Sequence, residues 1–307
     1  MTKTKVLLLT IHYPLAMATY YMRALRARDD VELKTTGPYT GSRIPWAGGM
    51  NLPEKYAIPP DIPLPYGPNV GRVPYALVKA KLGDWIPDIV ITVDAGICWV
   101  ERPSDGAVVH VATDGHVLNY DHQRSISDYF FNMHPNYAKN GDLPLPYAYD
   151  EFAMYKDGTA VKDVHAVTIG IPYAQRDAWV KRLRELGVSV LYEHGAILDE
   201  YREQNLRAHI GLNWASKKDM NCRVFEIMAM GLCPVMSRCP DFDMYFVEGE
   251  HYLGFDTLEE AVEKVLWAKN NPEKAQEIAD KAHALVTSGG FTFSDRVQTI
   301  LDTVGAK

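Results

Sequence analysis

Short apolar runs alternate with segments of helical spacing along most of the chain. In the first half, the runs at 5–11, 88–94 and 107–114 are rich in valine, leucine, isoleucine and alanine, and residues 18–31 have helical spacing. Apolar runs of this length are typical of strands buried on both faces of a sheet. Strands that alternate with helices predict a parallel sheet with helices on both faces.

The alternation restarts after about residue 160. Further strands are predicted at 163–170, 188–193, 208–214 and 233–237, and further helices at 174–187, 197–205 and 222–230. The restart predicts a second sheet, so the fold class is α/β with two doubly wound, Rossmann-like domains. The segment 150–162 is polar and lacks a strong period, which places an N-terminal domain at 1–155 and a C-terminal domain at 156–290.

Residues 37–76 differ from the rest because they hold nine of the nineteen prolines. A long irregular loop is uncommon in a compact domain unless it has a use. One interpretation is a surface excursion. The other is a wall of an acceptor pocket, in which aromatic side chains offer stacking surfaces: Trp46, Tyr56 and Tyr66.

Composition narrows the class of protein only slightly. The 307 residues are 47% hydrophobic and 23% charged, which is typical of a soluble globular protein, and no run of eighteen apolar residues predicts a membrane span. The four cysteines form no CxxC pair, so neither a zinc site nor a disulfide framework is indicated and we expect a cytoplasmic protein. The apolar run at 5–11 reads better as a buried strand than as a signal peptide. A net charge of -7 argues mildly against a general nucleic-acid coat protein without excluding a local basic groove.

The stretch 219–236, DMNCRVFEIMAMGLCPVM, carries the clearest candidate site. Asn221 or Asp219 can cap a helix that ends near Gly231. Because this helix follows the strand at 208–214, its N-terminus lies at the carboxyl edge of a parallel sheet, where α/β proteins bind ligands. Free backbone N–H groups there favour an anion, and Arg223 in the first turn adds a forked donor that matches phosphate.

Glu226 lies one helical turn beyond Arg223, and two interpretations are open. The two side chains could form a local i,i+3 pair, which contributes only about 0.2–0.5 kcal/mol. Alternatively, the carboxylate could accept hydrogen bonds from the two hydroxyls of a ribose. A buried carboxylate needs some such partner.

The segment RVFEIMAMGLCPVMS resembles the C-terminal part of GT-B glycosyltransferases, similar to the spore-maturation-type (CgeB-like) and group 1 enzymes, which include phage homologues. The resemblance implies two Rossmann-like domains that face each other across a cleft. In retaining relatives, a Glu-x7-Glu segment places its second glutamate on the donor ribose, and Glu226 falls at that position. The first glutamate is replaced by Lys218, so the resemblance does not decide between retention and inversion.

Other segments extend the resemblance. VTIGIPYAQRDAWVKRL is similar to the first βα unit of the donor domain, in which a basic residue, here Arg176, reaches the diphosphate. The C-terminal segment 291–307 is similar to the helix that usually crosses back to the first domain. The expected donor-binding residues are Arg176, Lys217, Asn221, Arg223 and Glu226. Lys217 or Lys218 would help to stabilise the departing diphosphate, without a metal.

Polar residues also follow the strands of the N-terminal domain: His12, Asp94, Asp114 and His116. Parallel strands bring their carboxyl ends to one edge of a sheet. We expect Asp114, His116 or His12 to act as a general base, with Trp46, Tyr66 and Asp94 on the acceptor side. The alternative is that a polar residue at a strand end caps a turn.

The residues and the resemblance together predict an enzyme that moves a hexose from a nucleotide-diphosphate sugar to a hydroxyl group. The resemblance points to a UDP-sugar, with no cofactor and no metal; Asp241 and Asp243 of the DFD sequence are read as part of a turn. The acceptor could be a glycan, a small molecule or a modified DNA base, so a phage-type enzyme acting on hydroxymethylated pyrimidines is an alternative. A nucleotide-sugar epimerase and a non-catalytic sugar-binding protein are further alternatives. An NAD-dependent dehydrogenase is disfavoured because no GxGxxG follows an early strand.

Overall fold

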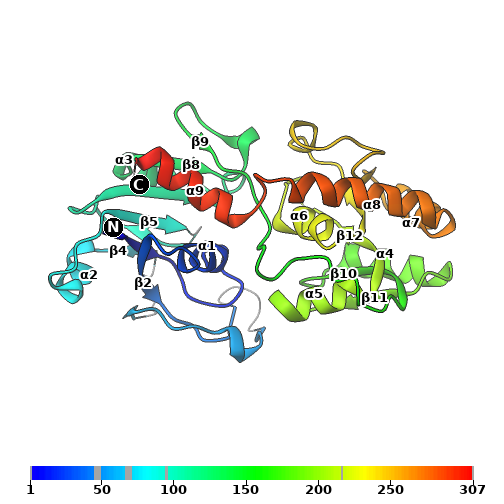
Figure 1. Cartoon of the computed structure of the whole chain (residues 1–307), viewed down its shortest axis with the longest axis horizontal. Helices are drawn as coiled ribbons and strands as arrows, with labels where there is room; N and C mark the ends of the chain where they lie inside the picture. The colour runs from blue at the N-terminus through cyan, green and yellow to red at the C-terminus, as the bar shows by residue number, and fades with distance from the viewer. Residues whose placement is uncertain (1, 45–49, 66–70, 94–95, 216, 306–307) are drawn as a thin grey trace. The chain divides into compact units, whose positions relative to one another are not determined.

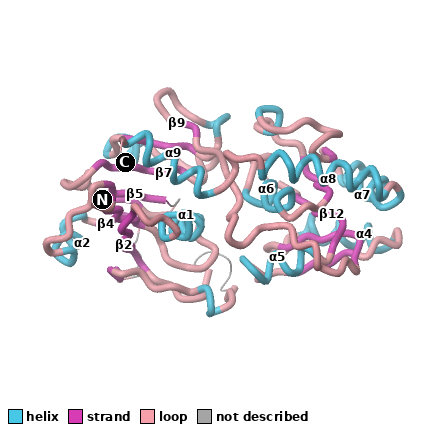
Figure 2. The backbone as a smooth tube through the Cα atoms, viewed as in Figure 1, coloured by secondary structure: helices cyan, strands magenta, loops and turns pink. Residues whose placement is uncertain are grey.

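The computed structural model describes residues 2–44, 50–65, 71–93, 96–215 and 217–305. The predicted acceptor-side residues Trp46, Tyr66 and Asp94 lie outside these ranges. The chain forms two compact units, one made of residues 1–146 and 293–307 and the other of residues 147–292. Each unit has a parallel sheet and its own helices, so the expected pair of Rossmann-like α/β folds is confirmed (Figures 1 and 2).

The first unit is built on a parallel sheet with strand order β3-β2-β1-β5-β7-β8-β9. Its strands are β1 (Thr4–Leu9), β2 (Val31–Pro38), β3 (Ile62–Leu64), β5 (Ile89–Val93), β7 (Ala107–Ala112), β8 (Tyr129–Asn132) and β9 (Leu143–Pro144). Its helices are α1 (Met17–Arg26), α2 (Tyr75–Leu82), α3 (Asp121–Ile126) and α9 (Phe293–Val304), with short 3-10 turns η1 (Glu54–Tyr56) and η2 (Pro135–Tyr137). A separate parallel pair joins β4 (Arg72–Val73) to β6 (Cys98–Trp99). The apolar run of β1 is fully buried at the centre of the sheet, as a continuous apolar strand should be.

The structure corrects the predicted helix at 18–31. The helix ends at Arg26, and β2 begins at Val31 and pairs along the whole of β1. The sequence VELKTTGP has too few long apolar side chains to be recognised as a buried strand. The predicted irregular loop at 37–76 is divided by the end of β2 and by the short elements η1, β3 and β4. Gly37, the residue before the last of β2, lies beside the carbonyl of Thr10, where an added Cβ would lie 1.7 Å from the Thr10 oxygen, so only glycine fits.

The second unit is built on a parallel sheet with strand order β11-β10-β12-β13-β14. Its strands are β10 (Val164–Ile169), β11 (Val190–Glu193), β12 (Ala208–Asn213), β13 (Cys233–Ser237) and β14 (Leu253–Phe255). Its helices are α4 (Ala174–Glu185), α5 (Leu198–Leu206), α6 (Cys222–Ala229), α7 (Leu258–Asn270) and α8 (Pro272–Thr287). The DFD sequence lies at the short 3-10 turn η3 (Phe242–Met244). The predicted strands and helices from residue 163 to residue 237 agree with these within three residues.

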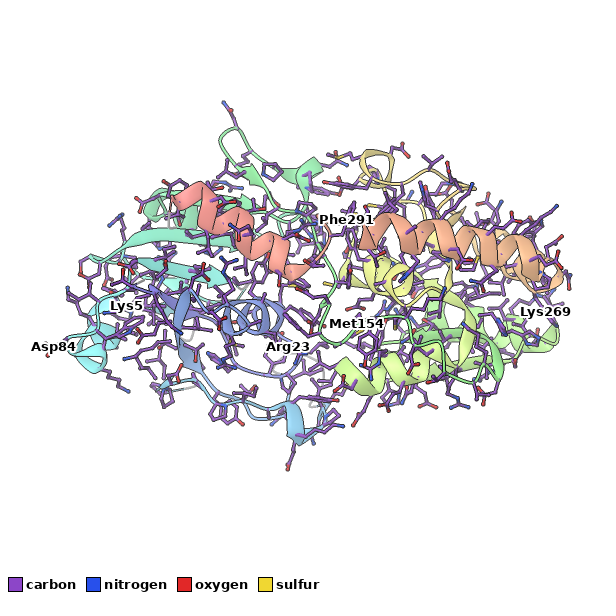
Figure 3. The ribbon with its side chains drawn as sticks, in the orientation of Figure 1. Lys5, Arg23, Asp84, Met154, Lys269 and Phe291 are labelled. Atoms are coloured by element: carbon purple, nitrogen blue, oxygen red, sulfur yellow. The ribbon has the colours of Figure 1, made fainter. Side chains whose placement is uncertain are left out.

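The chain enters and leaves the second unit through two segments that lie side by side. The N–H of Tyr149 donates to the carbonyl oxygen of Phe291 at 3.0 Å, and Tyr149 forms an isolated parallel bridge with Thr292. Phe291, which is labelled in Figure 3, follows α8 and precedes α9 along the chain. Within the first unit, α9 packs on α1, with Phe293 stacked on Tyr20 at 4.9 Å between ring centroids. No helix in the described ranges is both long and apolar enough to span a membrane.

Candidate functional site

The N-terminus of α6 is held at the carboxyl end of β12 by two asparagines. Of the two predicted caps, Asn221 is the one used: its Oδ1 accepts the backbone N–H of Arg223 at 3.1 Å. Asn213, the last residue of β12, accepts a hydrogen bond from the Arg223 guanidinium at 3.2 Å. Helix start and strand end are therefore tied together through Arg223, whose Nε is buried without a hydrogen-bond partner among the described residues.

Arg176 occupies the first turn of α4, the helix that follows β10. It is 3% exposed, and its guanidinium donates to the carbonyl oxygen of Ile171 at 2.7 Å and to the hydroxyl of Tyr173 at 2.9 Å. The guanidinium also lies over the Tyr173 ring, 4.5 Å from its centroid, a cation–π contact that fixes its plane. Within the described chain, its Nε has no hydrogen-bond partner.

The two guanidinium groups meet at Gly170, directly after β10. A Cβ on this glycine would lie 2.7 Å from Nη2 of Arg223 and 2.8 Å from Nη1 of Arg176. Burial, and then the positive charge of Arg223, lower the pKa of Arg176. Arg176 is buried and Arg223 partly buried, and two such cations that face the same backbone position repel each other unless an anion lies between them. The arrangement suits a group with several anionic oxygens, such as a diphosphate, since each guanidinium is a forked donor.

Glu226 is the other charged side chain of α6 and is 6% exposed. Burial raises its pKa to about 7, although Arg223 and Tyr201 act in the opposite direction. The Tyr201 hydroxyl interacts with both Arg223 and Glu226, but its geometry falls outside that of a regular hydrogen bond to either. A carboxyl group that takes up a proton near neutral pH can donate to, as well as accept from, a neighbouring hydroxyl group.

The raised pKa of Glu226 predicts a pH-dependent stability. Its folded pKa of about 7 lies above the ordinary value of 4.5, so the folded state binds the proton more tightly. This contribution is fully present below pH 4.5 and is lost as the pH rises through about 7. We expect wild type to lose stability over this interval relative to Glu226→Gln, which mimics the protonated acid. Calorimetric unfolding of both proteins at several pH values measures the difference; a difference that stays constant from pH 5 to pH 8 would contradict the assignment.

The two lysines before α6 are placed differently from the arginines. Lys217 and Lys218 are exposed in the turn that joins β12 to α6. Lys218 has a φ of 53°, in the left-handed region that a residue with a side chain rarely adopts. The residue that replaces the first motif glutamate is therefore held in an unusual backbone conformation.

In the first unit, the predicted base candidates have two environments. His12 is 2% exposed, and its Nε2 lies 3.2 Å from the carbonyl oxygen of Thr36, to which it donates. Burial lowers the pKa of His12 to about 4, so the ring is neutral at pH 7 but enclosed. Asp114 and His116 lie together in the partly exposed turn after β7, where Asp114 accepts a hydrogen bond from Thr113 at 2.8 Å.

His116 is supported by a second histidine that sequence reasoning missed. The rings of His116 and His134 are 4.3 Å apart between centroids. His134 is fully buried, and its Nε2 donates to the carbonyl oxygen of Thr113 at 3.1 Å. Nδ1 of His116 is buried without a hydrogen-bond partner in the described part of the chain, which leaves Nε2 as the nitrogen available to a substrate.

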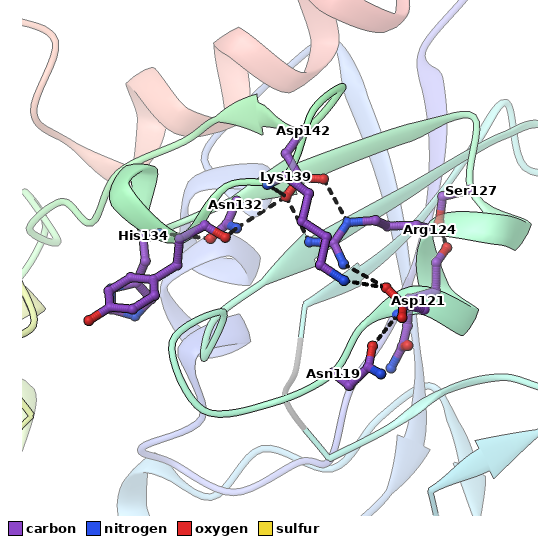
Figure 4. A network of polar contacts seen from close by, with 10 residues as sticks. Asn119, Asp121, Arg124, Ser127, Asn132, His134, Lys139 and Asp142 are labelled. Atoms are coloured by element: carbon purple, nitrogen blue, oxygen red, sulfur yellow. Dashed lines mark hydrogen bonds and ion pairs between the residues drawn. The ribbon is translucent and has the colours of Figure 1, made fainter.

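A polar network holds His134 in place (Figure 4). Its backbone N–H donates to Oδ1 of Asn132 at 2.9 Å, and Nδ2 of Asn132 donates to Asp142 at 3.2 Å. Both oxygens of Asp142 accept hydrogen bonds from Arg124 at 2.7 Å. In the sequence, His134 could have been noticed only as a polar residue after a strand, in NMHPN. The network itself has no local motif, because Arg124 and Asp142 are eighteen positions apart.

Asn132→Ala is expected to destabilise the first unit. The substitution removes the side-chain acceptor of the buried His134 backbone N–H and one of the donors to Asp142, at a cost of about 1–3 kcal/mol. Asn119→Ala is the matched control, since Asn119 is exposed and caps only the start of α3 at Asp121. Thermal unfolding of both variants tests this, and equal midpoints would show that the network does not hold the turn.

Comparisons with known proteins agree on the class of structure. Residues 159–302 match a family model described as glycosyl transferase-like. Sucrose-phosphate synthase from Thermosynechococcus elongatus is similar with a TM-score of 0.66 and 12% identity, over 99% of this chain and 100% of that chain. Anabaena HepE in complex with UDP-glucose gives a TM-score of 0.64 and 11% identity over 99% and 100% of the two chains. An alpha-glucosyltransferase in complex with UDP-glucose and DNA containing an abasic site gives 0.62 and 10% over the same shares. No curated protein matches the sequence.

Proposed function

We propose that this protein is a GT-B glycosyltransferase that transfers a hexose from a UDP-sugar to a hydroxyl acceptor. The GT-B fold expected from the sequence is confirmed by the comparisons, and the glycosyl transferase-like family model that matches residues 159–302 supports the transferase class. The donor, the acceptor and the residues of the reaction are the proposal. The observation that carries it is the pair of guanidinium groups against Gly170, that of Arg176 buried and that of Arg223 partly buried.

The diphosphate of the donor would bind between Arg176 and Arg223. This place lies at the carboxyl ends of β10 and β12. The N-termini of α4 and α6 supply backbone N–H groups and the positive ends of their dipoles there. As the bond between the sugar and the diphosphate breaks, negative charge grows on the leaving phosphate, and preorganised cations stabilise it most at that moment. Lys217 would add charge from the turn before α6.

The nucleoside would be held by Glu226. Its carboxyl group can exchange hydrogen bonds with the two ribose hydroxyls, which would provide the polar partners that its burial demands. Two of the similar structures contain UDP-glucose, which supports uridine as the first nucleoside to test. No group of three or more metal-ligating side chains occurs among the residues that the structure covers.

The acceptor would react at the turn after β7. The acceptor oxygen forms a bond to the anomeric carbon while the bond from that carbon to the diphosphate oxygen breaks. In an inverting transfer, the acceptor proton passes to His116 or Asp114; in a retaining front-face transfer, the departing phosphate can take it. His12 is the weaker candidate, because it is enclosed and already donates to Thr36.

The first experiment measures thermal shift and donor hydrolysis with UDP-, GDP-, ADP- and CMP-sugars. Saturable stabilisation by one nucleotide sugar, with slow release of the nucleoside diphosphate, is the expected result. A protein stabilised by none of the four would overturn the proposal.

The acceptor is tested separately. One similar structure contains DNA, so duplex DNA with hydroxymethylated pyrimidines is the second candidate acceptor beside glycans and small alcohols. Two UDP-N-acetylglucosamine 2-epimerase structures share the fold at TM-scores of 0.58 and 0.56. Release of a free epimerised sugar with no transfer to any acceptor would replace the transferase proposal with the epimerase alternative.

A further inference from the structure

The second unit has a hollow at the edge of its sheet opposite to Gly170. The hollow has a volume of about 140 Å³ and lies between the amino ends of β10 and β12 and the turn from α7 to α8. Its floor is apolar and comprises Ile210, Ala268 and Ala275, all buried. An apolar cavity of about 150 Å³ takes up benzene in a well-studied case, so this hollow has room for a ring-sized body.

The rim of the hollow is basic. His165, His209 and Lys269 line it, and Lys269 lies at the end of α7 (Figure 3). Burial lowers the pKa of both histidines. The charge of Lys269 lowers the pKa of His165 further, and Lys162 and His165 lower that of His209 further. The carboxylate of Asp163 at this edge of the sheet is already paired with Arg207 at 2.7 Å.

The hydrogen bonds of His165 fix which nitrogen carries its proton. The backbone N–H of Ser189 donates to Nδ1 of His165 at 3.1 Å, and a backbone N–H can only donate. Nδ1 is therefore an acceptor, and the neutral ring keeps its hydrogen on Nε2. His165 thus offers a donor, as Lys269 does, and the rim as a whole favours a ligand that accepts hydrogen bonds.

We propose that this hollow binds a small carboxylate that carries a ring or a branched apolar group. The apolar group contacts the floor of alanine and isoleucine, and the carboxylate contacts the basic side chains of the rim. A cation is disfavoured because Lys269 lies at the rim and Lys162 acts on His209 from nearby. A free phosphate would satisfy the rim but leave the floor uncovered. The pairing of an apolar floor with a few polar groups at one end is the usual form of a small-molecule site.

The site is separate from the proposed donor site and does not depend on the transferase activity. His165 and Gly170 are at opposite ends of β10, about 16 Å apart at ~3.3 Å per residue. A ligand here would contact β10 and β12, the two strands whose other ends carry Gly170 and Asn213, and neither arginine of the donor site.

Benzoate is the probe. Benzyl alcohol and benzylamine are neutral and cationic ligands of similar shape, and inorganic phosphate is an anion without an apolar group. We expect benzoate to shift the C2–H proton signals of His165 and His209 in a saturable way. We expect at least tenfold weaker binding of the other three ligands. Equal binding of benzyl alcohol and benzoate would overturn the proposal, and so would tighter binding of phosphate or the absence of saturation by benzoate.

Two variants locate the binding. His209→Ala and Lys269→Met should each weaken benzoate binding at least about fivefold, while Lys281→Met, an exposed lysine of α8 paired with Glu250, should not. An unchanged midpoint of thermal unfolding in the same variants shows that the unit is folded whether or not a nucleotide sugar binds, which separates this test from that of the donor site. Unchanged benzoate affinity in both variants would place the binding elsewhere and refute the site.

Discussion

Arg223→Ala is expected to weaken binding of the nucleoside diphosphate by about 10- to 150-fold, because each lost hydrogen bond to a charged group contributes about 1.5–3 kcal/mol. Arg176→Ala should have an effect of similar size, since both guanidinium groups face Gly170. Without nucleotide, Arg176→Ala should not be strongly destabilised, because it removes one of two like charges that repel each other. Arg223→Ala also removes a cation that acts on the buried Glu226, so it should be the less stable of the two variants. Isothermal titration with UDP and with the UDP-sugar measures both affinities.

The matched control for this prediction is Arg182→Ala. Arg182 is on the same helix as Arg176, but its side chain is 53% exposed and pairs only with Glu185 at 3.4 Å. The control should bind UDP like wild type. If both arginines could be removed without loss of affinity, the pair would be a packing feature of α4 and α6, and the donor site would have to lie elsewhere.

His116→Ala is expected to lower the rate of transfer by about 10²- to 10⁴-fold, the usual contribution of a general base. UDP affinity should be unchanged, because the proposed donor residues all belong to the other unit. The rate of transfer as a function of pH should also lose its dependence on a basic group. Single-turnover transfer with saturating donor measures the rate without a contribution from donor binding.

Asp114→Asn separates the two candidates in this turn. If Asp114 only accepts from Thr113 and caps the turn, its variant should retain most of the rate while that of His116 does not. Wild-type rates in both variants would show that the turn after β7 is structural. Such a result would favour a front-face transfer in which the phosphate takes the proton.

The sequence was sufficient to predict the parts of the fold that depend on local patterns. Continuous apolar runs identified β1, β5, β7, β10 and β12, because strands buried on both faces need no polar alternation. Arg176 and Arg223 were predicted one by one, from their places at two helix starts. Their meeting at Gly170 could not be predicted, because it depends on a glycine six residues before one arginine and fifty-three before the other.

The missed features have a common physical origin. β2 was missed because VELKTTGP takes its burial from neighbouring strands, and its residue Thr35 is bonded to Asp61 across twenty-six positions. Tyr201 was missed because nothing in helix α5 distinguishes an inward tyrosine that meets Arg223 and Glu226. His134, Asn132 and Asp142 form one network through the packing of β8 against its loop, so no spacing in the sequence marks them.

The order of the segments along the chain has a consequence for synthesis on the ribosome. The second unit is continuous, whereas the first needs α9 to cover α1, with Phe293 stacked on Tyr20. During translation the segment Tyr147–Thr292 can thus fold completely while the aromatic face of α1 still awaits its partner. The nascent first unit exposes Tyr20 and Tyr21 for the time that about 150 residues take to be made, roughly 7–30 s at ~5–20 residues per second. During that interval the first unit, whose aromatic side chains on α1 are uncovered, is the part of the molecule that we expect a chaperone to bind.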